Sequence, residues 1–196
     1  MNVGVDEAGT GSAISDAYAC AVILDPQLLE NKLITDSKKL TPKKRDQAYE
    51  IIMNSQTQYG VGTVTNKEID EMGMGKARRL IFVRALENLR KKVGQEVIFE
   101  HVILDGTLSI EYDHAKQIEC IPKADFIHAE VSAASILAKV LRDRNILELC
   151  SKESELAERY KWTSNKGYLT KDHLEAIGTH GLSEFHRKSF TYKTLA

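Results

Sequence analysis

The chain has few cysteines, few prolines and no long hydrophobic run. Cys20, Cys120 and Cys150 are far apart and form no Cys-x-x-Cys or Cys/His cluster, which argues against structural zinc and favours reduced thiols in a cytoplasmic protein. Only 3 of the 196 residues are proline and 42% are hydrophobic, so the chain can bury a core. No apolar run approaches the ~20 residues of a membrane span, and the first residues lack signal-peptide features. We expect a cytoplasmic protein that does not enter a membrane.

An excess of positive charge is also missing. The chain has 27 lysine and arginine residues against 28 aspartate and glutamate residues, a net charge of −1. Its overall charge therefore does not indicate a nucleic-acid-binding protein. Positive charge is concentrated locally instead, because the segment 161–196 contains more basic than acidic side chains.

What the chain does contain is an apolar run, Val3 to Val5, that leads into Asp6 and Glu7 and then into a turn bracketed by Gly9 and Gly11. A strand alternates its side chains between two faces, so adjacent carboxylates are expected to converge only where the strand ends or bulges. Glycine permits such a bend. The alternative interpretation is a strand end followed by a solvated acidic turn.

The hydrophobic pattern predicts an α/β protein with a mixed sheet flanked by helices. Strands are expected at residues 2–5, 17–24, 58–65, 101–105 and 117–121, and helices at 42–53, 66–72, 76–93, about 131–146 and 170–177. Thr41 before Pro42 is typical of a helix start. Asn66 is the expected cap of the helix that ends at residue 72, and Gly94 stands where the helix at 76–93 is expected to stop. We predict a main domain at 1–150 and a small helical, basic C-terminal extension at 151–196 that packs on it.

Two later aspartates repeat the pattern of the opening stretch. Asp105 ends an apolar strand before Gly106, and Asp125 stands shortly before a helix. Clustered carboxylates repel one another, and Mg²⁺ or Mn²⁺ removes the repulsion because both ions prefer oxygen ligands. Two such ions ~3.5–4 Å apart can promote phosphodiester cleavage. From the spacing alone, ordinary turns and helix caps at Asp105 and Asp125 are the simpler interpretation.

Short blocks spread along the chain resemble those of a known family. The blocks are Gly-Val-Asp-Glu-Ala-Gly at 4–9, Asp-Ser-Lys-Lys-Leu at 36–40, Leu-Asp-Gly at 104–106, Lys-Ala-Asp at 123–125, Val-Ser-Ala-Ala-Ser-Ile-Leu-Ala-Lys-Val at 131–140, and the tail segments Asn-Lys-Gly-Tyr at 165–168 and His-Arg-Lys-Ser-Phe at 186–190. In their order and extent they resemble type 2 ribonuclease H (ribonuclease HII).

The resemblance implies a ribonuclease H-like fold and metal-dependent endonucleolysis of RNA paired with DNA, including single ribonucleotides embedded in duplex DNA. The products would be a 3′-hydroxyl and a 5′-phosphate. It also implies a two-metal site for Mg²⁺ or Mn²⁺ held by four catalytic carboxylates: Asp6, Glu7, Asp105 and Asp125. The partners would be RNA–DNA hybrids and ribonucleotide-containing duplex DNA, and a monomer is the simplest expectation.

The resemblance also implies contacts with the substrate. The loop Gly9-Thr10-Gly11 would read the 2′-hydroxyl, the group that distinguishes RNA from DNA, and Tyr168 would pack against the neighbouring deoxyribose. Ser135 resembles a position near the substrate, and Lys38 and Lys139 could neutralise phosphates. From the residues alone, the alternatives are a tyrosine packed at a turn, a small serine in an alanine-rich helix and solvated lysines.

Other basic residues could also contact phosphates, although a solvated surface is the ordinary interpretation: Lys39, Arg142, Arg144, Lys166, Arg187 and Lys188. The histidines form no metal-ligand spacing. We therefore expect His101, His128 and His173 to be structural or on the surface.

Two positions depart from the family pattern. Thr10 stands where the family usually has arginine, and Ser15-Asp16 replaces a Gly-Pro pair. The related type 3 ribonuclease H carries Gly-Thr-Gly, so Thr10 leaves open a type 3-like enzyme that cuts RNA tracts and spares single ribonucleotides. A second alternative is a non-catalytic module that binds hybrids.

Overall fold

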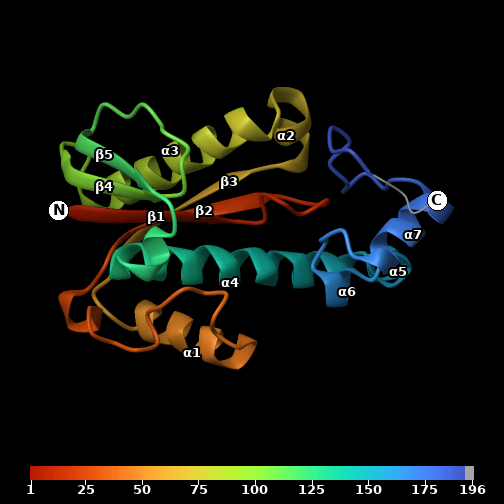
Figure 1. The fold of residues 1–196 in the computed structure, drawn as a ribbon, viewed down its shortest axis with the longest axis horizontal. Helices are drawn as coiled ribbons and strands as arrows, with labels where there is room; N and C mark the ends of the chain where they lie inside the picture. Colours follow the sequence, from red (N-terminus) through yellow and green to blue (C-terminus); the bar gives the residue numbers. More distant parts are fainter. Residues whose placement is uncertain (193–196) are drawn as a thin grey trace.

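The sheet contains five strands in the order β3-β2-β1-β4-β5 (Figure 1). The structure is a computed structural model of the chain, and it describes residues 1–192. The strands are β1 (Asn2–Ala8), β2 (Ala17–Ile23), β3 (Gln58–Val64), β4 (Phe99–Asp105) and β5 (Ala115–Ile121). β1, β2 and β3 pair antiparallel, whereas β4 joins β1 and β5 joins β4 in parallel. This mixed sheet confirms the predicted fold class.

Helices cover both faces of the sheet (Figure 1). The helices are α1 (Pro42–Met53), α2 (Asn66–Met72), α3 (Met74–Val93), α4 (Ala129–Lys152), α5 (Ser154–Arg159), α6 (Trp162–Asn165) and α7 (Lys171–His180), with short 3₁₀ turns η1 (Pro26–Leu28) and η2 (Ala124–Phe126). One core lies between the sheet and α3, and a second core between the opposite face and helices α1 and α4. Alternate residues of β1 therefore face α3 and α4.

Local signals set most helix ends. The Thr41 side chain accepts a hydrogen bond from the amide of Lys44 at the start of α1, as predicted. Thr65 caps α2 in a capping box with Glu68, so the cap predicted at Asn66 was wrong by one residue. Gly94 follows the last residue of α3, again as predicted.

The packing of β3 against α3 depends on glycine. A side chain at Gly60 or Gly62 would collide with the backbone of α3 near Ala85 and Ile81. The strand can therefore approach the helix closely only because these two positions lack a Cβ atom.

The C-terminal part contains more helix than predicted. Of α5, α6 and α7, only α7 was expected; α5 and α6 have 6 and 4 residues, too few to show a helical period. A third cluster joins Ala13 and Ile14 to residues of α4–α7 such as Trp162. The boundary at 150 stays a prediction, and residues 193–196 of the extension, including Lys193, lie outside the described residues.

Two other expectations concern thiols and membranes. Cys20, Cys120 and Cys150 are all free thiols, in line with the expectation from their spacing. Among residues 1–192, no helix is both long and apolar enough to cross a membrane.

Candidate active site

β1 loses one of its two neighbours just before its carboxylates. Parallel pairing with β4 ends where Val5 lies opposite Leu104, whereas antiparallel pairing with β2 continues to Ala8. Asp6 and Asp105 are the next residues on the two strands after that last parallel pair. The prediction that the strand ends before the carboxylates was wrong, because β2 alone keeps β1 extended through Glu7.

The separation of β1 and β4 explains how adjacent strand residues share one site. Val3 and Val5 pack in the core on the α3 side, so the alternation of a strand turns Glu7 towards α3 and Asp6 towards α4. Both nevertheless line one pocket of about 340 Å³, because the pocket lies where the sheet is open.

This pocket brings together every predicted site residue except Asp125. It is lined by Asp6, Glu7, Ala8, Gly9, Thr10, Gly11, Ser37, Lys38, Asp105, Ser135, Lys139 and Tyr168. These residues come from β1, the loop after it, the loop before α1, the end of β4, α4 and the tail. The pocket therefore depends on the whole fold rather than on one segment.

Asp6 is buried beside other negative charges. Burial, then the neighbouring Glu7 carboxylate and also Asp105, raise the pKa of Asp6 to about 8. Its Oδ1 accepts a 2.7 Å hydrogen bond from the amide of Glu7. Ser135, on the facing side of α4, lowers the same pKa by hydrogen bonding but does not cancel the effect of burial. Ser135 Oγ also lies 2.9 Å from Ser37 Oγ, so it packs in the core and lines the pocket.

Glu7 is held by an arginine that sequence reasoning missed. Arg78 of α3 donates from Nη2 to Glu7 Oε1 at 2.6 Å. Burial nevertheless raises the pKa of Glu7, and Arg78 only opposes that shift. Glu7 Oε2 and Arg78 Nε are buried and have no hydrogen-bond partner among the described residues. Arg78 lies near the N-terminus of α3, 71 residues from Glu7, and no local pattern indicates such a contact.

Asp105 and Asp125 are linked through η2. Asp105 Oδ1 accepts a 2.8 Å hydrogen bond from the amide of Ala124, which fixes the position of the following Asp125. Burial, then the carboxylates of Asp105 and Asp36, raise the pKa of Asp125 to about 6. Asp36 is a further buried carboxylate to which the sequence assigned no role; its Oδ1 accepts from the Lys38 amide at 2.8 Å.

The carboxylates do not form a ready-made metal cage. Within residues 1–192, no three aspartate, glutamate, histidine or cysteine side chains are already placed as ligands of one ion. Glu7 is engaged by Arg78, and Asp125 is buried and does not line the pocket. The four-carboxylate metal site therefore stays a prediction, and binding of an ion there would require these side chains to move.

The loop after β1 is fixed through its backbone. Gly9 has φ 86°, a conformation that favours glycine, and its carbonyl accepts from the Ser12 amide at 3.1 Å. Arg187 donates to the carbonyls of Thr10, at 3.1 Å, and Ser15, at 2.9 and 3.0 Å. The Ala13 amide donates to Gly167 at 2.8 Å. The C-terminal part therefore holds this loop in place.

Two arginines proposed as phosphate contacts are instead fully buried. Arg187 binds the loop carbonyls, and Arg142 donates to Ser12 Oγ at 2.6 Å and to the carbonyl of Lys166. A buried guanidinium group turns most of its donors towards protein acceptors, and of the Arg142 nitrogens only Nε has no partner among the described residues. The expectation that Arg142 and Arg187 neutralise phosphates was therefore wrong.

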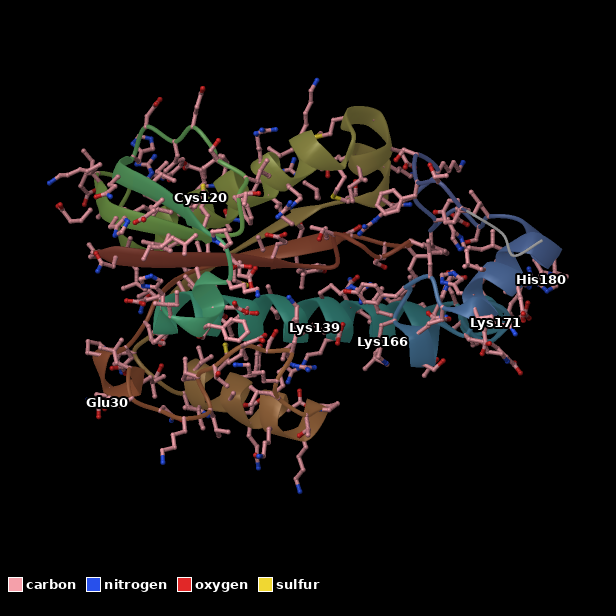
Figure 2. The ribbon with its side chains drawn as sticks, in the orientation of Figure 1. Glu30, Cys120, Lys139, Lys166, Lys171 and His180 are labelled. Atoms are coloured by element: carbon pink, nitrogen blue, oxygen red, sulfur yellow. The ribbon has the colours of Figure 1, made fainter. Side chains whose placement is uncertain are left out.

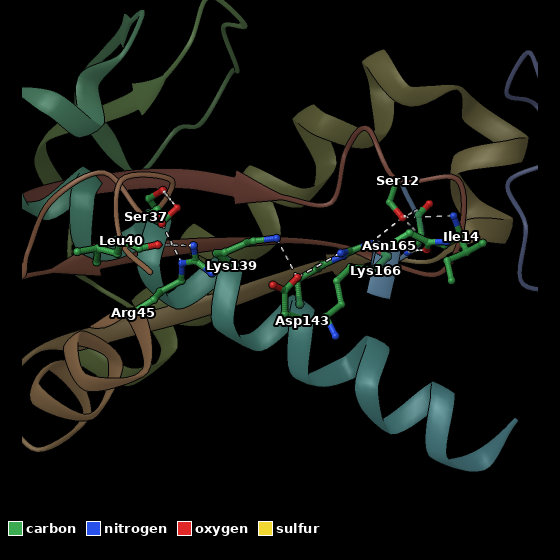
Figure 3. A network of polar contacts seen from close by, with 12 residues as sticks. Ser12, Ile14, Ser37, Leu40, Arg45, Lys139, Asp143, Asn165 and Lys166 are labelled. Atoms are coloured by element: carbon green, nitrogen blue, oxygen red, sulfur yellow. Dashed lines mark hydrogen bonds and ion pairs between the residues drawn. The ribbon is translucent and has the colours of Figure 1, made fainter. Parts of the chain in front are cut away.

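Tyr168 lies at the loop end of the pocket. Its ring is 36% exposed, and Lys139 Nζ and Arg142 Cζ lie 5.6 and 5.0 Å from the ring centre. Lys139 also pairs with Asp143 at 3.0 Å (Figure 3). Figure 2 shows Lys139 beside the middle of α4 and Lys166 nearer its C-terminal end. Because Tyr168 is partly exposed and not enclosed in the core, its ring is available to a ligand.

A buried histidine pair contacts the backbone of Tyr168. His173 Nε2 lies 3.1 Å from His186 Nε2 and accepts from Trp162 Nε1 at 3.2 Å. His173 Nδ1 is 3.0 Å from the Tyr168 carbonyl. Burial, then the neighbouring His173, lower the pKa of His186 to about 4, and burial lowers the pKa of His173. The expectation that His173 is structural is confirmed by this buried position.

Comparisons with known proteins match nearly the whole chain to one family. The family profile described as Ribonuclease HII matches residues 3–193. The chain is 40% identical to a protein named Ribonuclease HII from Alkaliphilus oremlandii, over 97% of this chain and 90% of that protein. It resembles the crystal structure of ribonuclease H2 from Pyrococcus horikoshii OT3 (29% identity, TM-score 0.73, 96% of this chain and 93% of that one).

A more distant structure shares the fold alone. The structure titled Bst-RNase HIII in complex with Mn²⁺ is 20% identical, with a TM-score of 0.70 over 97% of this chain and 67% of that chain. The profile match and the identity to the Alkaliphilus protein, each over nearly the whole chain, are decisive. The chain belongs to the ribonuclease HII family and is a ribonuclease H endonuclease.

Proposed function

We propose that the chain is a divalent-metal-dependent endonuclease that cuts the RNA strand of RNA–DNA duplexes. In our proposal it also cuts on the 5′ side of single ribonucleotides embedded in duplex DNA, and it leaves 3′-hydroxyl and 5′-phosphate ends. The observation that carries the proposal is a pocket in which two buried carboxylates with raised pKa, Asp6 and Glu7, adjoin Asp105 and a loop fixed by its backbone.

The donor set fits hard cations. Within residues 1–192, Glu7 Oε2 is buried without a partner, and burial beside Glu7 raises the pKa of Asp6. Oxygen ligands of this kind suit Mg²⁺ or Mn²⁺, which Asp6, Glu7, Asp105 and Asp125 would hold. Two bound ions would lower the pKa of an attacking water and stabilise the leaving oxygen. The fold neighbour with Mn²⁺ supports the same chemistry.

The chain's own residues orient the reaction. Arg78 fixes the Glu7 carboxylate, and the Ala124 amide fixes Asp105. Lys38 and Lys139 line the pocket and would attract the phosphate to be cleaved. Tyr168 would pack on the sugar next to the cleavage site.

The loop supports cleavage at single ribonucleotides despite Thr10. Arg187 binds the main-chain carbonyl of residue 10, a contact that does not depend on the side chain there. The glycine-bracketed backbone can therefore approach a 2′-hydroxyl with threonine as with arginine. The competing function, a type 3-like preference for RNA tracts, is favoured only by the identity of Thr10.

The test is cleavage of two labelled duplexes in Mg²⁺ and in Mn²⁺: one with a single ribonucleotide in DNA, the other with a continuous RNA strand on DNA. We expect both to be cut, the first on the 5′ side of the ribonucleotide. Cleavage of the hybrid alone would favour the type 3-like function. Binding without cleavage in either metal would favour a hybrid-binding module and contradict the carboxylate mechanism.

A further inference from the structure

An exposed apolar pair stands immediately after Asp125. Phe126 is 52% exposed and Ile127 is 70% exposed. Among residues 1–192, the large exposed hydrophobic side chains are otherwise isolated from one another in sequence. Single exposed apolar residues need no explanation, but an adjacent pair beside a candidate active site indicates a contact surface.

A lysine accompanies the exposed ring. Lys39 Nζ lies 3.8 Å from the centre of the Phe126 ring, and the preceding Lys38 lines the carboxylate pocket. Tyr168 has the same combination, since Lys139 Nζ lies 5.6 Å from its ring centre. An exposed aromatic ring beside a cation therefore occurs twice around the pocket, and this is the combination that binds nucleic-acid strands.

Helix α4 places the two rings on opposite sides of the carboxylates. Ser132, near its N-terminus, donates to the Asp125 carbonyl at 2.7 Å, next to Phe126. Arg142, further along α4, lies 5.0 Å from the ring of Tyr168. Ser135, which contacts Ser37 beside Asp6, stands between them.

The length of α4 gives the scale of the surface. Ten residues separate the two contacts, or roughly 15 Å at the rise of an α-helix. At about 3.4 Å per nucleotide along a duplex strand, this corresponds to about four nucleotide steps. Figure 3 shows Lys139 and Asp143 on α4, with Ser37 towards one end of the network and Lys166 towards the other.

We propose that Phe126 and Lys39 form a second backbone-contact site for the cleaved strand, opposite Tyr168. The Phe126 ring packs against a sugar, and Lys39 pairs with the adjacent phosphate. The inference rests on the proposed function, because it names where that substrate continues beyond the carboxylates. Nucleic acid is favoured over a protein partner because Lys39 contacts the exposed ring and Lys38 lines the adjoining pocket, and lysines match phosphates.

The first experiment measures binding of an RNA–DNA hybrid by fluorescence anisotropy in EDTA, where no cleavage occurs. Phe126→Ala should raise Kd about tenfold, as expected for one aromatic contact with a nucleotide. Ile98→Ala is the matched control, because Ile98 is also 52% exposed but precedes the start of β4, at the far end of the strand from Asp105. Its Kd should equal that of the unmodified protein.

The second experiment shortens the cleaved strand from one end or the other. The effect of Phe126→Ala should disappear when nucleotides are removed on one side of the cleavage site, and that of Tyr168→Ala when they are removed on the other.

A third measurement tests the lysine. Lys39→Gln should lower the dependence of log Kd on log salt by about one phosphate contact. Phe126→Leu and the thermal midpoint of each variant check that folding is intact.

The outcomes separate the two proposals. If the unmodified protein cuts the hybrid but Phe126→Ala binds every duplex with unchanged Kd, this inference is overturned and the proposed function stands. A loss of affinity that does not depend on strand length also overturns it, since it indicates a structural or protein-docking role. If the unmodified protein neither binds nor cuts hybrids, the proposed function itself has failed.

Discussion

The two halves of the pocket differ in how completely the protein satisfies them. In the loop half, Arg187 and Arg142 bind the loop at residues 10–15, and the paired histidines support Tyr168. In the carboxylate half, like charges are buried together, and Glu7 Oε2 has no partner within the described part of the chain. In the loop half one donor, Arg142 Nε, is also buried without a partner among the described residues, but only the carboxylate half buries like charges side by side.

This difference matches the two proposed roles, recognition of the sugar by the loop half and catalysis by the carboxylate half. A rigid loop can discriminate a sugar because no binding energy is spent on ordering it. A group of carboxylates that repel one another gains most when a cation arrives. We therefore expect substitutions in the loop half to reduce stability, and substitutions in the carboxylate half to reduce activity with little loss of stability.

The largest effect should come from Asp105→Asn. Loss of a carboxylate from the site should reduce cleavage of the hybrid to the level measured without enzyme, because the ions lose a ligand. The thermal midpoint in EDTA should be unchanged or higher, since one of the repelling charges is gone. Glu100→Gln, on the same strand but exposed, is the control and should remain active. A fully active Asp105→Asn variant would contradict the assignment.

Arg187→Ala should be the most destabilising change. It leaves the carbonyls of Thr10 and Ser15 without their donors in a buried place, at a cost of about 3 kcal/mol in the free energy of unfolding. Urea denaturation measures this loss, and Lys188→Ala, an exposed neighbour, should change it by less than about 0.5 kcal/mol. Equal stability of the two variants would show that the loop is not held by Arg187.

The histidine pair should make the loop half sensitive to acid. The folded-state pKa of His186 is lowered to about 4 from 6.5, so the unfolded chain binds a proton first as the pH falls. Stability contributed by neutral His186 is complete above pH 6.5 and is lost as the pH falls towards 4, by about 2 kcal/mol at pH 5. Denaturation at pH 7.5 and pH 5 measures this loss of stability. The control variant His180→Gln, at an exposed histidine, should show the full loss, and His186→Asn should show a smaller one.

Among these variants, Arg78→Met should change stability the least, but its response to Mg²⁺ tests the carboxylate half directly. Without Arg78, the Glu7 carboxylate loses its ion-pair partner, and the metal-free protein should lose about 1 kcal/mol in the free energy of unfolding because the pair is partly exposed. Mg²⁺ should raise the thermal midpoint more in this variant than in the unmodified protein. Arg79→Met, at an exposed position on the same helix, should respond to Mg²⁺ like the unmodified protein.

Sequence reasoning succeeded where a short segment decides the structure. The Thr41-Pro42 helix start, the Gly94 helix end and the apolar strands at β1 and β4 are local features, and each was found. The resemblance named eleven site residues, and all of them except Asp125 line the pocket. Ala8 and Ser37 also line it but were not named as site residues.

It failed where a residue's role depends on a partner far away in the chain. Arg142 and Arg187 carry the same charge as a phosphate-binding arginine, and only burial against the loop reveals their role. Arg78 is one of two successive arginines on α3, and only its contact with Glu7 distinguishes it from Arg79. The helices α5 and α6 were too short to produce a period.

The bond from Arg187 to the first loop has a consequence for biosynthesis. Ser15 and Thr10 emerge early during synthesis, but their arginine follows 172 and 177 residues later. A ribosome-bound chain can form the sheet before that arginine exists, yet it cannot make the Arg187 bonds that fix the loop at residues 10–15. We therefore expect this loop to take its final conformation only after residue 187 has been synthesised, later than the strands of the sheet.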